Sequence, residues 1–238
     1  MRDLSHCRST AELWFGADDS DMLPAMHIWK LVFEDADLLV VSKPSGLLSV
    51  PGRGLEGAIN LSAQVQDHYP GALVVHRLDM STSGLMMFAR HAYAQRALQR
   101  AFESRTVAKR YIAVVQGWPA DDAGSCNAPM RLDWPARPRQ VVDWETGKPS
   151  YTRWHVLQRL GSGHRAQSRR ARMSLEPVTG RSHQLRVHMQ ALGHPIIGDE
   201  LYGSAPGPGE RLLLHATNLS LQHPVHGTPL QFESLPPF

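Results

Sequence analysis

The apolar residues of this chain occur in short runs, and the length of these runs limits its fold more than any other feature. Typical runs span residues 38–41 and 85–89, and turn residues such as Pro44 and Gly117 separate them. None of them reaches the roughly 18 consecutive apolar residues that a helix needs to cross a bilayer. We therefore expect short strands and helices packed around a core, with no membrane segment.

The order of these segments indicates the fold class. Strand patterns lie at residues 31–33, 38–42, 74–76, 85–89, 110–116, 151–160, 172–176 and 212–221. Helical patterns lie at residues 58–69, 92–104 and 182–192. Residues 118–149 are rich in proline, glycine and tryptophan and predict loops with short strands. Because strands and helices do not alternate regularly, we expect an α+β fold.

Length and composition predict one folded domain. The chain has 238 residues, of which 42% are hydrophobic and 20% charged, enough to bury a core without crosslinks. We assign residues 1–27 to an N-terminal extension, because they carry many acids and no clear period, and residues 28–238 to a single domain. Cys7 and Cys126 are too far apart for a disulfide framework, and the first residues lack the apolar segment of a secretion signal. We therefore expect a cytoplasmic protein.

Basic residues are unevenly distributed, although the net charge is only +3. Arginine dominates two clusters, at residues 90–110 and 153–172, and the second cluster contains six arginines and no acid. The planar guanidinium suits phosphate groups, so the clusters indicate a polyanionic partner. A solvated basic face would have the same composition.

Two sequence patterns resemble cofactor or metal sites, but the residues around them argue against such sites. Residues 52–57 match G-x-G-x-x-G, but prolines separate them from the preceding strand, whereas a dinucleotide site needs that strand to run directly into the loop. Among the 13 histidines, His215, His223 and His226 have no acidic or cysteine partner at ligand spacing. We expect no nucleotide cofactor and no metal.

One polar stretch lies between two apolar segments. Residues 76–79 read His-Arg-Leu-Asp, which places Asp79 on a loop held by the core, beside Arg77. Such a carboxylate is either half of a structural ion pair or a catalytic acid whose ionisation is tuned by its surroundings. The residues alone leave both interpretations open.

Two further stretches have a functional and a structural interpretation. On the helix predicted at residues 182–192, Leu185 and Met189 share an apolar face and Arg186 lies on its flank. An arginine at this position either pairs with a fixed carboxylate or is exposed to solvent without a functional role. Tyr111 follows a Lys-Arg pair on a predicted strand, where it is either a core tyrosine or a functional one.

Together these stretches resemble the RluA family of RNA pseudouridine synthases. The matching motifs lie at residues 43–47, 76–85, 109–111, 180–188 and 194–199, in an extent from about residue 31 to the C-terminus. The resemblance implies a mixed, mostly antiparallel central sheet with flanking helices and a catalytic cleft, formed by residues 28–238. It also implies that the substrate is RNA, namely a tRNA anticodon stem-loop, large-subunit 23S rRNA or both, and that no cofactor is required. We expect a monomer.

The resemblance assigns the catalytic carboxylate to Asp79, its cationic partner to Arg186 and stacking on the uracil to Tyr111. It places five further residues at the substrate: His76, Arg77, Arg181, His183 and Leu185. Isomerisation of uridine breaks the N1–C1′ bond and rejoins the base through C5. Asp79 would attack C1′, remove the C2′ proton or add to C6, and each route needs an ionised carboxylate, which a neighbouring guanidinium favours. The uridine must first leave its stack, and Arg77 would hold the gap.

Two other functions fit parts of the pattern. A catalytically idle RNA-binding protein would keep the basic clusters, but it would have no need for Asp79, Tyr111 and Arg186 together. A hydrolytic glycosidase needs two carboxylates that flank the bond, and among the residues that the resemblance places at the site only Asp79 is a carboxylate.

Overall fold

The computed structural model describes residues 29–52, 59–161, 169–203 and 210–238. Its helices are α1 (Leu61–His68), α2 (Ala92–Glu103) and α3 (Gln184–Ala191). Its strands are β1 (Lys30–Glu34), β2 (Leu38–Lys43), β3 (Leu73–Val74), β4 (Ser83–Ala89), β5 (Ala108–Gln116), β6 (Ala123–Cys126), β7 (Met130–Leu132), β8 (Gln140–Val142), β9 (Thr152–Leu160), β10 (Arg170–Pro177), β11 (Leu214–Gln222) and β12 (Pro229–Glu233).

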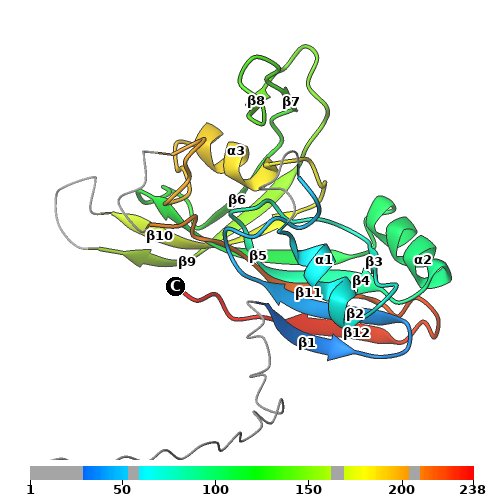
Figure 1. Ribbon diagram of the computed structural model, residues 1–238. Coiled ribbons are helices and arrows are strands. Elements are labelled where there is room, and N and C mark those ends of the chain that lie inside the picture. Colours follow the sequence, from blue (N-terminus) through cyan, green and yellow to red (C-terminus); the bar gives the residue numbers. More distant parts are fainter. Residues whose placement is uncertain (1–28, 53–58, 162–168, 204–209) are drawn as a thin grey trace, which may run out of the picture.

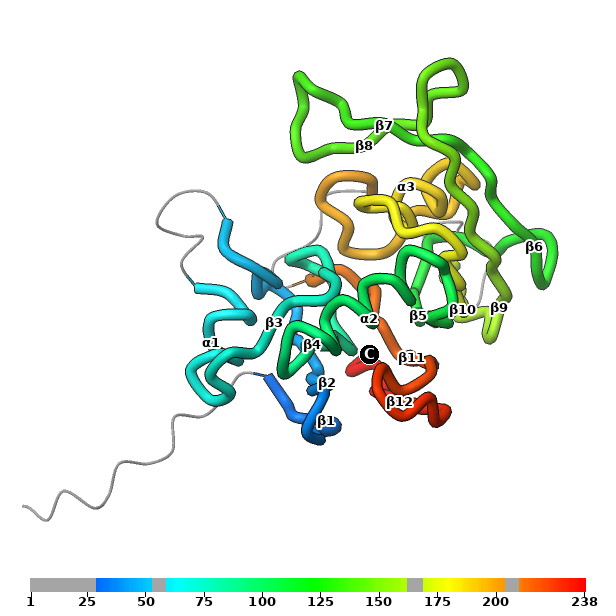
Figure 2. Tube along the Cα trace, turned by 90° about the vertical axis from the view of Figure 1, so that its right-hand side faces the viewer, coloured from blue at the N-terminus to red at the C-terminus, as the bar shows by residue number. Residues whose placement is uncertain are grey.

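Most of these strands form one large sheet (Figure 1). Its order is β1-β2-β4-β11-β5-β10-β9-β6, while β3 also pairs with β4 and β12 also pairs with β11. Within the described residues the pairings are antiparallel except that of β4 with β11. Strands β7 and β8 form a separate hairpin, which stands beyond α3 at the far end of the molecule from β1 (Figure 2). The expected α+β class and mostly antiparallel sheet are confirmed.

Strands β2 and β4 are buried on both faces. Met86 and Phe88 of β4 pack in the same cluster as Leu61 of α1, whereas Leu85 and Met87 pack in the same cluster as residues of α2. Because side chains alternate along a strand, α1 and α2 cover opposite faces of this half of the sheet. Double coverage explains why these strands read as unbroken apolar runs rather than as alternating ones.

Helix α3 covers the other half of the sheet. Its Leu185 and Met189 join Met173 of β10 in a third core cluster, so the predicted apolar face is confirmed. The polar side of the helix is also buried, which the sequence pattern did not predict. His188 there bonds through its ring nitrogens to Thr152 of β9 and to Ser150, at 2.8 and 2.9 Å. These buried bonds fix the helix against β9, and with it the position of Arg186.

The predicted hairpin at the start of the domain and all three predicted helices are present. Strand β12 was not predicted, because it pairs with β11 at the side of the sheet and buries little beyond Phe232, so its apolar pattern is weak. The expected extension at residues 1–27, most of the glycine-rich loop at residues 52–57 and residues 162–168 of the arginine-rich turn lie outside the described residues. No helix among the described residues is long and apolar enough to cross a membrane.

Candidate active site

A cavity of about 1060 Å³ opens between the loop that carries Asp79 and the N-terminal end of α3. All of the residues that the motifs placed at the site line this cavity: His76, Arg77, Asp79, Tyr111, Arg181, His183, Leu185 and Arg186. They come from segments far apart in the chain, which the β4–β11–β5 order of the sheet brings together. The cavity is large enough to admit a nucleoside.

The end of β2 and the segment that follows it support the Asp79 loop through hydrogen bonds. Lys43 is buried, and its Nζ donates hydrogen bonds to the carbonyl oxygens of Pro44, Leu47 and Met80 at 2.7–3.0 Å. Ser49 adds bonds in both directions to the backbone of residue 78, at 2.6 and 3.1 Å. Burial lowers the pKa of Lys43 to about 7, although the charge of Asp79 opposes this shift. The loop is therefore a rigid support on which Asp79 is presented to the cavity.

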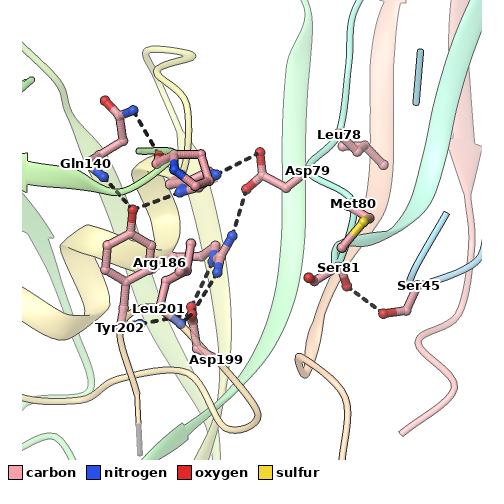
Figure 3. A network of polar contacts seen from close by, with 12 residues as sticks. Ser45, Leu78, Asp79, Met80, Ser81, Gln140, Arg186, Asp199, Leu201 and Tyr202 are labelled. Carbon is pink, nitrogen blue, oxygen red and sulfur yellow. Dashed lines mark hydrogen bonds and ion pairs between the residues drawn. The ribbon is translucent and has the colours of Figure 1, made fainter. Parts of the chain in front are cut away.

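Arg186 faces Asp79, but a second carboxylate holds it in place (Figure 3). Its Nε and Nη2 donate to the two oxygens of Asp199 at 2.8 and 2.7 Å, while its Nη1 lies 3.5 Å from Oδ2 of Asp79. Asp199 is fully buried, and the Asp79 side chain is 27% exposed. The two-point contact with Asp199 fixes the plane of the guanidinium, so its remaining nitrogen points a positive charge at Asp79.

His183 is the other group beside Asp79. It precedes α3 in a left-handed conformation, with φ 55°, and its Nε2 lies 3.9 Å from Oδ1 of Asp79. Its Nδ1 shares a 2.7 Å hydrogen bond with the hydroxyl of Tyr202, which also accepts the backbone N–H of Gln140 at the start of β8 (Figure 3). Burial lowers the pKa of His183, so the ring is neutral at pH 7 and adds no charge beside Asp79.

Tyr111 lies in the centre of the sheet, where β5 pairs with both β10 and β11. Its ring packs against two of the core clusters and also lines the cavity. Burial and the charge of Asp79 raise its pKa, so the hydroxyl keeps its proton at neutral pH. Tyr111 is thus both a core residue and a cavity residue, and the two interpretations of the sequence are compatible.

His76 makes structural contacts in addition to lining the cavity. Its Nε2 accepts the backbone N–H of Met87 at 3.0 Å, and its ring stacks on Phe102 with centroids 4.5 Å apart. Burial lowers its pKa to about 3, helped by the nearby charge of Lys109, so the ring is neutral. Only its Nδ1–H remains to meet a substrate.

Basic residues line the cavity, but most described residues of the two predicted arginine clusters are not among them. Arg77, Arg105, Lys109 and Arg181 line it together with Arg186. From the cluster at residues 90–110 only Arg105 and Lys109 contribute, and the described part of the cluster at residues 153–172 contributes none. Several of those arginines instead pair with acids on the surface, as Arg159 does with Asp122 at 2.6 Å.

Sequence reasoning missed three residues that build the site. Asp199 lies in a motif that carried the resemblance, and Lys43 lies in another, but neither received a role. Tyr202 follows Asp199 by three positions, and Oδ1 of Asp199 accepts the backbone N–H groups of Leu201 and Tyr202 at 3.0 and 3.1 Å. An aspartate side chain often accepts backbone N–H groups of the turn that it begins. The aspartate at position 199 was therefore the signal in the sequence for Asp199 and Tyr202.

The expectation that His223 and His226 lack an acidic partner was wrong. Ring nitrogens of both lie 3.6 Å from Oδ2 of Asp37, and Nε2 of His223 lies 3.0 Å from Asp35, because the β11–β12 turn packs against the β1–β2 turn. These groups are close enough to hold a metal ion. However, Nδ1 of His223 accepts two backbone N–H groups, which leaves the ring proton on Nε2, directed at the carboxylates. The hydrogen bonds of the His223 ring are complete as they stand, and we assign this cluster a structural role.

Comparison with known proteins agrees with the fold. The RNA pseudouridylate synthase family profile matches residues 37–191. The chain is 51% identical over 207 residues to the dual-specificity RNA pseudouridine synthase RluA of Vibrio vulnificus, covering 86% of this chain and 82% of that one. It is 45% identical over 214 residues to the enzyme of the same name from Escherichia coli K12, covering 89% and 95%.

A solved structure agrees with the sequence matches. Human RNA pseudouridylate synthase domain containing 1 superposes with a TM-score of 0.72 at 30% identity, covering 88% of this chain and 84% of that one. The chain therefore belongs to the RNA pseudouridylate synthase family. The resemblance to the RluA family is confirmed, and the protein is an RNA pseudouridine synthase, which is an isomerase.

Proposed function

We propose that Asp79 is the residue that breaks and re-forms the glycosidic bond, on uridines in both a tRNA anticodon stem-loop and 23S rRNA. The observation that carries the first part is the position of Asp79 in the cavity, 3.5 Å from a guanidinium clamped by Asp199. The second part is supported by relatives of 45–51% identity whose names describe dual-specificity RNA pseudouridine synthases.

The proposed roles of the other residues follow from their positions. A flipped uridine enters the cavity, where Tyr111 stacks on the uracil and Leu185 forms an apolar wall. Arg186 keeps Asp79 ionised and oriented, and His183 contacts its other oxygen. The N1–C1′ bond breaks, the base turns, C5 bonds to C1′, and the C5 proton is lost while N1 gains one. Arg77, His76 and Arg181 contact the substrate around the cavity entrance, and no nucleotide cofactor takes part.

We predict that Asp79→Asn binds the anticodon stem-loop but forms no pseudouridine, because the amide carries no negative charge. The measurement is tritium release from RNA labelled at C5 of uridine, beside a binding titration with the same RNA. Asp67→Asn is the matched control, since Asp67 is exposed on α1, away from the cavity residues. Tritium release by Asp79→Asn at the rate of the control would remove Asp79 from the mechanism.

The substrate proposal is tested by presenting both RNAs. Wild-type protein should release tritium from an anticodon stem-loop and from a 23S rRNA fragment, and mapping of cellular pseudouridines should show both sites lost in a deletion strain. Activity on only one RNA would contradict the dual specificity. We also propose that the enzyme is a cytoplasmic monomer, for which light scattering at working concentration should give about 26.5 kDa.

The assay also separates this reaction from hydrolysis. Glu103 and Glu200 line the same cavity, so a second carboxylate is available nearby. A hydrolytic glycosidase would release free uracil, whereas an isomerase retains the base in the RNA. We expect pseudouridine and no free uracil by chromatography of the digested product.

A further inference from the structure

The turn that joins β7 to β8 exposes a tryptophan. Trp134 is 65% exposed, and the guanidinium carbon of Arg137 lies 4.7 Å from the centroid of its ring. An exposed indole ring lacks the free energy of burial that usually stabilises a tryptophan. The guanidinium over one face attracts the ring and restricts its orientation. The turn therefore displays a large aromatic surface together with a positive charge.

This surface is held rigidly. Within the turn, the backbone N–H of Asp133 donates to the carbonyl of Arg139 at 2.9 Å, and the N–H of Arg139 donates to Ala136 at 3.0 Å. At the base of the hairpin, Arg131 pairs with Asp143 at 2.5 Å. The aromatic surface is thus preorganised rather than carried on a loose loop.

The hairpin is also attached to the catalytic site. The backbone N–H of Gln140 donates to the hydroxyl of Tyr202, which is bonded to His183 beside Asp79 (Figure 3). Leu132, Pro138 and Gln140 line the catalytic cavity itself. Leu132 and Pro138 lie on either side of the turn that carries Trp134, so this turn adjoins the wall of the cavity. The β7–β8 hairpin itself stands beyond α3 (Figure 2).

We propose that Trp134 stacks on an unpaired nucleobase of the substrate RNA, next to the uridine that enters the cavity, with Arg137 supporting the ring. This inference rests on the proposed RNA substrate. A flipped uridine leaves its neighbours without a stacking partner, and a rigid ring beside the cavity replaces that partner. Every base has a π-face, so such a contact tolerates different loop sequences, as an enzyme acting on two RNAs requires.

The test compares the RNA affinity and kinetics of Trp134→Ala with those of two other variants. Trp134→Ala should weaken binding of the anticodon stem-loop about 5- to 150-fold, the factor that matches base–aromatic stacking. It should raise KM and leave kcat near wild type, since Trp134 is not among the residues that line the cavity. Trp134→Phe keeps a ring and should restore most of the affinity. Trp144→Ala is the matched control, because Trp144 is 71% exposed and lines a different cavity.

A second measurement identifies the base. Stem-loops with one abasic nucleotide at each loop position in turn should bind wild type less tightly at one position beside the target. At that position Trp134→Ala should show no further loss, because both changes remove the same contact.

The proposal is overturned if Trp134→Ala binds like Trp144→Ala, or if every abasic change weakens the variant as much as it weakens wild type. Failure of the proposed function is a separate outcome. A wild-type protein that binds the RNA but releases no tritium would contradict the function, and the abasic comparison would still decide the stacking.

Discussion

Arg186 contacts two carboxylates that differ in burial, and this difference separates support from chemistry. Asp199 is fully buried and makes the two short bonds, whereas Asp79 is partly exposed and makes the longer contact. A buried charge without its partner is costly, so Asp199 and Arg186 depend on each other for stability. Asp79 is then free to interact with substrate while the guanidinium stays in place.

We predict that Asp199→Ala lowers the free energy of unfolding by about 3–5 kcal/mol, because the buried Arg186 loses both short bonds and keeps only the longer contact with Asp79. Asp122→Ala is the control, since its side chain is 74% exposed in the pair with Arg159. That variant should cost less than about 1 kcal/mol, as surface pairs do. Urea denaturation monitored by tryptophan fluorescence measures both, and equal losses would show that Asp199 does not hold the cation.

At the level of the elements, the contact between β4 and β11 positions the Asp79 loop relative to Tyr111. Gly84 has φ +114°, and a Cβ there would lie 2.3 Å from the carbonyl oxygen of Ala216. Only glycine allows the two strands to approach this closely. The parallel pairing of these strands brings the loop before β4 beside β5, on which Tyr111 lies.

We predict that Gly84→Ala destabilises the fold by about 2–5 kcal/mol, the sum of positive-φ strain and overpacking. Gly71→Ala is the control, because φ there is +84° but no atom lies within 4 Å of the added Cβ. It should cost only about 1–2 kcal/mol. If chemical denaturation gave the two variants the same midpoint, the close approach of β4 and β11 would not be the reason for glycine.

For the whole molecule, buried neutral histidines determine the response to acid. Burial lowers the pKa of His215 to about 4 and that of His76 to about 3, and it also lowers the pKa of His188. In the unfolded chain these rings titrate near pH 6.5. The unfolded state therefore binds more protons below pH 6.5, and stability falls as the pH drops from about 6.5 to about 4.

We predict that His215→Gln flattens this fall by up to about 1.4 kcal/mol per pH unit, because one proton no longer distinguishes the two states. The measurement is the unfolding free energy in urea between pH 7 and pH 4.5. His155→Gln is the matched control, since His155 is exposed on β9. A His215→Gln slope as steep as wild type would mean that other groups account for the acid sensitivity.

The sequence by itself determined most of the elements and eight of the residues that line the cavity. Residues 38–41 form an unbroken apolar run and residues 182–192 have a helical period, and turn residues follow both, so their structure follows from short-range physics. Asp79, Tyr111 and Arg186 were identified because each lies in a distinctive motif, and all three line one cavity. Only the tertiary structure decided which carboxylate holds Arg186, that the polar side of α3 is buried, and that the turn carrying Trp134 adjoins the cavity. These features depend on contacts between segments that are distant in the chain. A local sequence pattern cannot predict which distant side chains come into contact.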